Sequence, residues 1–124
     1  MDNKFTRDKI LDAICNMYIK KDVTYLYGYT SKKMVYQIQP DTQAEIMVGH
    51  RKVYHYLKEK LRQLKKQNTP VKAEIIESGN GTKNAILLEE NKTVHGLVIE
   101  IQNEKIQRMN LVPINLIQQF NQSN

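Results

Sequence analysis

The chain has 124 residues, of which 40% are hydrophobic and 26% charged, a composition typical of one folded domain and unlike that of disordered or collagen-like chains. Its single cysteine excludes an internal disulfide, and no apolar run approaches the roughly 20 residues that a membrane-spanning helix needs. The formal net charge is +6, and the N-terminal residues interleave charged with apolar side chains instead of forming a signal peptide, so we expect a cytoplasmic protein that does not enter the membrane.

The N-terminal third predicts two helices and one strand. Apolar side chains recur at helical spacing from Lys4 to Lys20, which predicts an α-helix. Asp22 is a good N-cap and Gly28 a good helix terminator, so a short second helix is expected between them. The alternating residues Lys33 to Gln39 predict a short strand, and a loop is expected from Pro40 to Val48.

A third helix is predicted to begin at Gly49 and to end at Asn68, and it holds the net charge of the chain. The segment from His50 to Lys66 alone carries a net charge of +6. Apolar residues follow one face of this helix: Val53, Leu57, Leu61 and Leu64. Bases follow the opposite face and form what we call the basic ridge: Arg51, His55, Lys58, Arg62 and Lys65.

The basic ridge has two interpretations. It is either a solvated helix face or an electrostatic footprint for nucleic acid or an acidic partner. Binding of nucleic acid is the less favoured, because neither a base-reading motif nor a stacking aromatic residue accompanies the bases.

Beyond Pro70 the hydrophobic pattern changes from helical spacing to alternation, which predicts four strands. They cover Val71 to Ser78, Thr82 to Glu90, Thr93 to Gln102 and Lys105 to Ile114. Tight turns such as Asn80-Gly81 join them, so we expect an antiparallel meander, followed by a polar C-terminal tail over residues 115–124.

Both faces of the predicted sheet are apolar. Neighbouring apolar residues such as Leu97 and Val98 point to opposite faces of a strand. The helices can cover only one face, and large exposed apolar patches usually mark interfaces. We therefore predict a homodimer formed through the other sheet face.

The order of these elements resembles that of the nuclear transport factor 2-like superfamily, which includes ketosteroid isomerase-like and SnoaL-like proteins. The resemblance spans Phe5 to Ile114, and three segments carry it: Asp22-Val23 with Leu26 and Tyr29, Gly49 to Val53 with Leu57, and Lys105 to Met109 with Leu111 to Ile114. It implies a single domain over residues 1–114 of the α+β class, with three N-terminal helices packed on a curved, mostly antiparallel sheet. Such a cone-shaped domain encloses one pocket and is commonly dimeric through the sheet.

The resemblance to the isomerase branch also implies a general-base Asp near the end of the first strand, with a Tyr and a protonated Asp as oxyanion hole. The base position falls on Gln37, which cannot accept a proton, so steroid isomerisation is disfavoured. The Tyr position maps near Ile14, with Tyr18 one turn later, and the second Asp maps near Val94 or His95.

The remaining candidates suit binding better than catalysis. All seven tyrosines lie in the first half of the chain, where a wall of tyrosine rings suits a flat apolar ligand and ordinary core packing explains them equally well. His95 and Glu100 lie on opposite faces of one strand and cannot form a dyad. The candidate ligand-binding residues are Tyr18, Tyr36, Gln37, Tyr54, Leu57, His95 and Glu100.

The leading hypothesis is a small dimeric domain with an apolar pocket that binds a small hydrophobic ligand. The alternative is an enzyme, an isomerase, cyclase or dehydratase, with Tyr18, Tyr36 or His95 as acid or base. A second alternative is binding of nucleic acid or an acidic partner by the basic ridge. No cluster of residues has metal-ligand spacing, so neither a metal nor a cofactor is expected.

Overall fold

A computed structural model describes residues 4–39, 45–76 and 83–113 of the chain. The elements follow the order α1 (Lys4–Lys20), a 3₁₀ helix η1 (Val23–Leu26), β1 (Thr30–Ile38), β2 (Glu45–Val48), α2 (His50–Lys66), β3 (Val71–Ile76), β4 (Lys83–Glu90), β5 (Thr93–Gln102) and β6 (Lys105–Pro113). The predicted turn at Asn80-Gly81 and the predicted tail at residues 115–124 lie outside the described residues.

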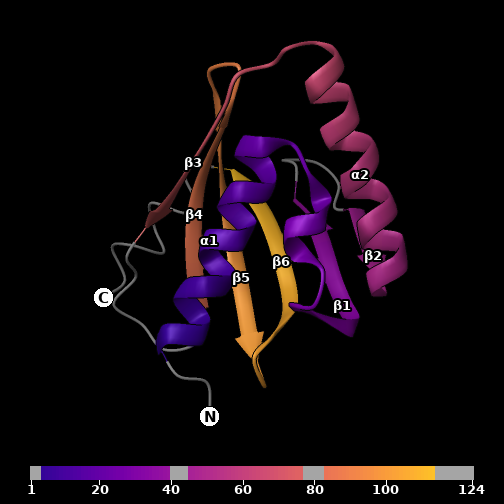
Figure 1. Cartoon of the computed structure of the whole chain (residues 1–124), viewed down its shortest axis with the longest axis vertical. Coiled ribbons are helices and arrows are strands. Elements are labelled where there is room, and N and C mark those ends of the chain that lie inside the picture. Colours follow the sequence, from indigo (N-terminus) through magenta and orange to yellow (C-terminus); the bar gives the residue numbers. More distant parts are fainter. Residues whose placement is uncertain (1–3, 40–44, 77–82, 114–124) are drawn as a thin grey trace.

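The six described strands form one curved sheet in the order β2-β1-β6-β5-β4-β3 (Figure 1). The last four strands of the chain pair antiparallel with one another, as the alternating pattern predicts. The first strand, β1, pairs with β2 antiparallel and with β6 parallel, so the sheet is mixed. The α+β class and the four-stranded meander are therefore confirmed.

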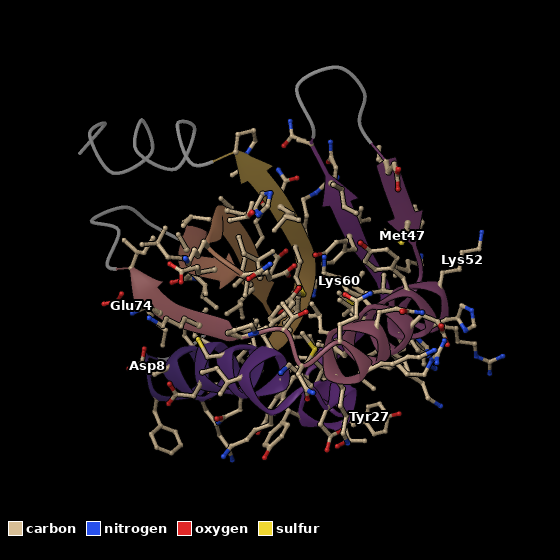
Figure 2. All side chains as sticks on the ribbon, turned by 90° about the horizontal axis from the view of Figure 1, so that it is seen from above. Asp8, Tyr27, Met47, Lys52, Lys60 and Glu74 are labelled. Atoms are coloured by element: carbon tan, nitrogen blue, oxygen red, sulfur yellow. The ribbon has the colours of Figure 1, made fainter. Side chains whose placement is uncertain are left out.

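Both α-helices lie on the same side of the sheet (Figure 2). We call the sheet face that packs on them the inner face and the opposite one the outer face. The core between the layers contains apolar side chains from both helices and from the inner face, including Ile10, Ile14, Leu57, Leu61, Met34, Tyr36, Ile86, Leu97, Ile99 and Met109. The helical and alternating spacings of these residues place them all on the buried side of their elements.

The prediction of three N-terminal helices is wrong in its count. The described residues form two α-helices, and the segment after Asp22 makes only a single 3₁₀ turn of four residues. Asp22 caps it as predicted, since its carboxylate accepts from the Thr24 N–H at 3.0 Å. The turn cannot grow into an α-helix because Tyr27 has an extended backbone and Gly28 a φ of 88°.

The predicted loop from Pro40 to Val48 is also corrected, because its last four residues form β2. Ile46, Met47 and Val48 are three consecutive apolar residues, which hide the alternation of a strand. Their pairing with β1 places them at the edge of the sheet.

Gly49 connects this edge strand to α2. Its N–H donates to the Met34 carbonyl oxygen at 2.8 Å, and its φ of 100° is one that residues with a side chain rarely adopt. The first turn of α2 is therefore held against β1. Among the described residues, no helix combines the length and apolarity that crossing a membrane requires.

The packing of α2 on the sheet yields a stability prediction. Leu57 has no accessible surface, so Leu57→Ala should lower the free energy of unfolding by about 2–5 kcal/mol through lost burial and the cavity left behind. Lys58→Ala, at the next and exposed position, should change it by less than about 0.5 kcal/mol. Urea unfolding followed by circular dichroism measures both, and equal effects of the two substitutions would contradict the packing described.

Candidate functional site

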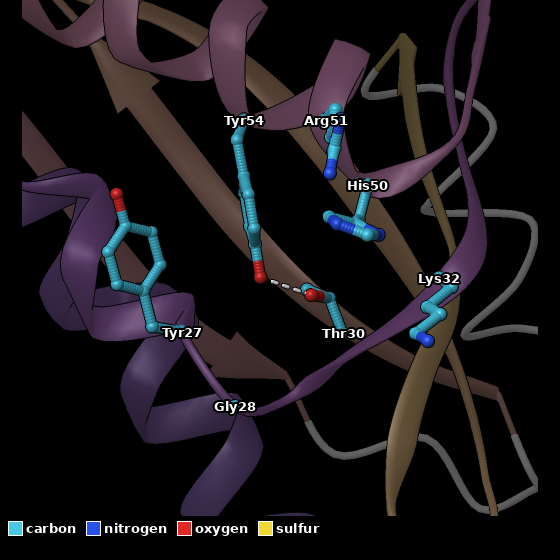
Figure 3. A pocket seen from close by; sticks show the side chains of 7 residues that line it. All are labelled: Tyr27, Gly28, Thr30, Lys32, His50, Arg51 and Tyr54. Atoms are coloured by element: carbon cyan, nitrogen blue, oxygen red, sulfur yellow. Dashed lines mark hydrogen bonds between the residues drawn. The ribbon is translucent and has the colours of Figure 1, made fainter.

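A hollow of about 400 Å³ lies between the start of β1 and the first turn of α2 (Figure 3). We call it the hollow, and its lining residues are Tyr27, Gly28, Thr30, Lys32, His50, Arg51 and Tyr54. Two of them are aromatic, three are basic and none is acidic. Its volume falls within the range that small-molecule sites occupy.

Two segments that are about twenty residues apart in the sequence form the hollow. After η1, the positive φ of Gly28 turns the chain into β1 and leaves the Tyr27 ring exposed. β1 then contributes Thr30 and Lys32, while the first turn of α2 contributes His50, Arg51 and Tyr54.

Tyr54 is the fixed centre of the hollow. Its hydroxyl hydrogen-bonds to the Thr30 hydroxyl and donates to the Leu26 carbonyl oxygen at 3.4 Å. The Tyr27 ring lies 5.2 Å from the Tyr54 ring, centroid to centroid, and the His50 ring meets Tyr54 edge-on at 5.7 Å. The hollow therefore has an aromatic wall in which hydrogen bonds hold Tyr54 in place and the Tyr27 ring packs beside it.

The lining of the hollow contains three bases and no carboxylate. Within the described part of the chain, the ion pairs join Lys60 to Glu90, Arg62 to Glu59 and Arg108 to Glu100. None of these pairs includes Lys32, His50 or Arg51.

Of the residues predicted to bind a ligand, Tyr18, Tyr36 and Leu57 lie together in the core. All three have no accessible surface, so no water-sized space adjoins them. The two hydroxyl groups hydrogen-bond to each other at 3.2 Å. Burial raises the pKa of both phenols well above the ordinary value, so both are neutral at physiological pH.

Gln37 and Glu100 lie on the outer face instead. Because neighbouring residues of a strand alternate, Gln37 points away from the side on which Tyr36 is buried. The Arg108 Nη1 donates to Gln37 Oε1 at 2.6 Å, and the Arg108 Nε lies 3.6 Å from the Glu100 carboxylate. The position that the isomerase resemblance assigns to a general base thus belongs to a polar cluster outside the cone.

The last two predicted residues lie apart from these groups. His95 is half-buried on β5, opposite Leu88 of β4 and Pro113 of β6. Tyr54 alone of the seven lines the hollow. The structure therefore brings Tyr18, Tyr36 and Leu57 together but not the whole predicted set.

Sequence reasoning missed most of the hollow. Tyr27, Thr30 and Lys32 adjoin a turn whose position relative to α2 is set by the pairing of β1 with β2, which no local pattern reveals. Gly49 before His50 and Arg51 was the available signal, because a glycine between a strand and a helix marks a sharp junction.

The structure gives little support to a reactive cysteine or to a metal site in the described residues. Burial, with a smaller contribution from the Asp12 carboxylate, raises the pKa of the Cys15 thiol to about 11, so the thiol stays protonated and unreactive. Within the described ranges, no three metal-ligating side chains gather in one place.

The comparisons with known proteins identify the fold. An NTF2-like protein of unknown function from Mesorhizobium loti gives a TM-score of 0.72 over 90% of this chain and 93% of its own, at 11% sequence identity. A SnoaL-like protein of unknown function from Burkholderia thailandensis gives 0.67 over 88% and 94%, at 13% identity. An NTF2-like protein of unknown function from Cytophaga hutchinsonii gives 0.66 over 87% and 96%, at 13% identity.

The chain has the NTF2-like fold. This agrees with the resemblance that its sequence shows to the superfamily, and the comparisons do not point to a specific member of it. No protein-family model matches the chain, and no curated protein matches it. Identities this low establish a shared NTF2-like architecture, and function has to be argued from the site.

The buried tyrosine pair of this NTF2-like domain predicts a loss of stability in alkali. The pKa of both phenols is raised in the folded state, so the unfolded chain releases these protons first, from about pH 10. The free energy of unfolding should therefore fall as the pH rises above about 10.

The double variant Tyr18→Phe/Tyr36→Phe should show a shallower alkaline fall, because it no longer holds these two protons. Urea unfolding at about pH 8 and about pH 10.5 measures the difference. Tyr25→Phe removes a phenol at an exposed position and serves as the control. An alkaline fall in the double variant as steep as that of the unmodified chain would contradict the assignment.

Proposed function

We propose that this NTF2-like chain is a dimeric domain that binds a small ligand in the hollow and does not catalyse a reaction. The observation that carries the proposal is the aromatic wall formed by Tyr27 and Tyr54, which adjoins a space of about 400 Å³. A flat, largely apolar molecule gains most from such a wall, since aromatic rings offer broad contact at fixed orientation.

The hollow is favoured over the interior of the cone as the binding site. A ligand inside the cone would have to displace Tyr18, Tyr36 or Leu57, which fill that space and have no accessible surface. Forcing extra volume into a packed core typically costs about 1–3 kcal/mol. The hollow needs no such displacement.

The geometry also favours binding over catalysis. An enzyme of the isomerase, cyclase or dehydratase type needs a proton-transferring group that a neighbour holds in position. The hollow offers His50, whose ring lies 5.7 Å from the Tyr54 ring, and none of the seven lining residues is a carboxylate that could orient it. Gln37 is held by Arg108 on the outer face.

A ligand test follows from this proposal. Titration of the ¹⁵N-labelled domain with flat bicyclic aromatic compounds should shift the amide signals of Gly28, Thr30 and Arg51. Tyr27→Ala should weaken binding by about 2- to 10-fold, because it removes one ring of the wall. Tyr25→Ala removes a neighbouring exposed ring that does not line the hollow, and it should bind as the unmodified domain does. Signals that shift around Leu57 and Leu97 instead would move the site into the cone.

The homodimer of the proposal uses the outer face. Ile46 and Val48 of β2 expose 57% and 58% of their surface, and the pairing of β1 with β2 puts Val35 beside Val48 on the same face. Both α-helices lie on the other side of the sheet (Figure 2). Exposed apolar residues on a face that no helix covers favour association with a second copy.

The dimer is tested by mass in solution. Sedimentation should give about 29 kDa, twice the 14.5 kDa of one chain, because two-fold pairing closes at two copies. Val48→Asp places like charges on both sides of the contact and should give the monomer. Ile19→Asp changes an exposed apolar residue of α1, on the other side of the sheet, and should leave the dimer intact. A monomer for the unmodified chain at about 10 µM would overturn the proposal.

A further inference from the structure

The bases of the hollow lie together around one aromatic ring. Figure 3 shows Arg51, His50 and Lys32 to one side of the Tyr54 ring and Tyr27 to the other. They come from the first turn of α2 and from β1, so their proximity results from the fold and not from neighbouring positions in the sequence.

These three bases differ from other bases of α2 in their ion pairing. Lys60 reaches Glu90 at 3.4 Å, and Arg62 reaches Glu59 at 3.0 Å. None of these ion pairs among the described residues includes Lys32, His50 or Arg51. The cationic side chains of Lys32 and Arg51 line one pocket that has no carboxylate in its lining, and such a pocket has a positive potential that attracts an anion.

We propose that the ligand of the hollow is a small anion that carries a flat ring. Its ring would pack against Tyr54, on the side of that ring where the bases lie, and its carboxylate or phosphate would lie beside Lys32, His50 and Arg51. This inference rests on the proposed function, because it assigns the chemical class of the ligand that the hollow binds.

The chemistry of the three bases suits a ligand with an anionic group attached to a ring. The Arg51 guanidinium offers parallel N–H donors that match two oxygens of a carboxylate or phosphate. The Lys32 ammonium adds a mobile point charge, and the His50 ring adds an N–H donor. His50 and Arg51 are the first two residues of α2, so the positive end of the helix dipole adds to the same potential.

The volume suits a ligand of two fused rings with one anionic group. Small-ligand sites of this size, about 400 Å³, bind such molecules when a few polar groups fix the orientation of an otherwise apolar surface. Here the polar groups are all cationic or neutral, which discriminates against a ligand that carries a positive charge.

Three probes with the same ring separate the effect of charge from that of shape. 2-Naphthoate carries a carboxylate, 2-naphthyl phosphate carries a phosphate, and 2-naphthamide is the neutral counterpart of the carboxylate. Calorimetric titration at low salt should give affinities for both anions at least about fivefold higher than for the amide. Added salt should weaken the binding of the anions and leave that of the amide unchanged.

Matched variants locate the charge effect. Lys32→Gln and Arg51→Gln should each weaken the binding of 2-naphthoate by about fivefold and leave 2-naphthamide unaffected. Lys33→Gln and Lys52→Gln remove the adjacent exposed bases, which do not line the hollow, and should leave both affinities unchanged.

The outcomes distinguish this inference from the proposed function. If 2-naphthamide binds in the hollow as tightly as the anions, the charge inference is overturned and the proposed function stands. If Lys33→Gln and Lys52→Gln weaken the anions as much as the lining variants do, the effect is one of general surface charge and the inference is overturned. If none of the three probes binds, both fail. Tighter binding of the phosphate or of the carboxylate identifies the anionic group within the proposed class.

Discussion

The hydrogen bond from the Gly49 N–H to the Met34 carbonyl oxygen, 2.8 Å long, sets where α2 begins. Met34 is fully buried in the middle of β1, so this contact anchors the first turn of α2 to a rigid point of the core. From there α2 runs over the inner face and buries Val53, Leu57 and Leu61. The same contact places His50 and Arg51 opposite Thr30 and Lys32. Both the closure of the core and the presence of the hollow therefore depend on it.

β1 shows how one strand supplies three different surfaces. Met34 and Tyr36 point into the core, and Val35 and Gln37 point to the outer face, as alternation requires. At the beginning of the strand, Thr30 and Lys32 face the first turn of α2 and line the hollow. A register shift relative to β6 lies between Thr30 and Val35, and it marks the change from the packed part of the strand to the open part.

Much of this fold could be predicted from the sequence, because its largest elements carry strong local patterns. The helical spacing of α1 and α2 and the alternation of β3 to β6 give the elements and their antiparallel order. Tight turns were expected between these strands, and in the turns at Asn91-Lys92 and Asn103-Glu104 all four residues have positive φ, as type I′ hairpin turns require. The similarity to the nuclear transport factor 2-like superfamily then supplied the arrangement of these elements.

The rest depends on pairings between distant segments. Four residues of β2 are too few, and too uniformly apolar, to display an alternation. Nothing local indicates that β1 pairs parallel with β6, because the paired residues lie 73 to 76 positions apart in the sequence. Arg51 was assigned to the basic ridge from its helical position alone, and only the position of β1 reveals that it lines the hollow. Tyr54 was predicted as a ligand residue within a tyrosine wall, although the wall to which it belongs includes Tyr27 rather than Tyr18 and Tyr36.

The buried pair Tyr18 and Tyr36 and the aromatic wall of the hollow differ in the ligand charge that they can accommodate. Tyr18 and Tyr36 lie where burial raises the pKa of the phenols, which means that this environment disfavours a negative charge. An anionic ligand would meet the same penalty there, because no described base is paired with these hydroxyl groups and neither side chain has surface accessible to solvent. At the hollow, an anion keeps part of its contact with water and meets three bases instead. The electrostatics of the interior and of the hollow therefore agree in placing an anionic ligand at the start of α2, outside the cone.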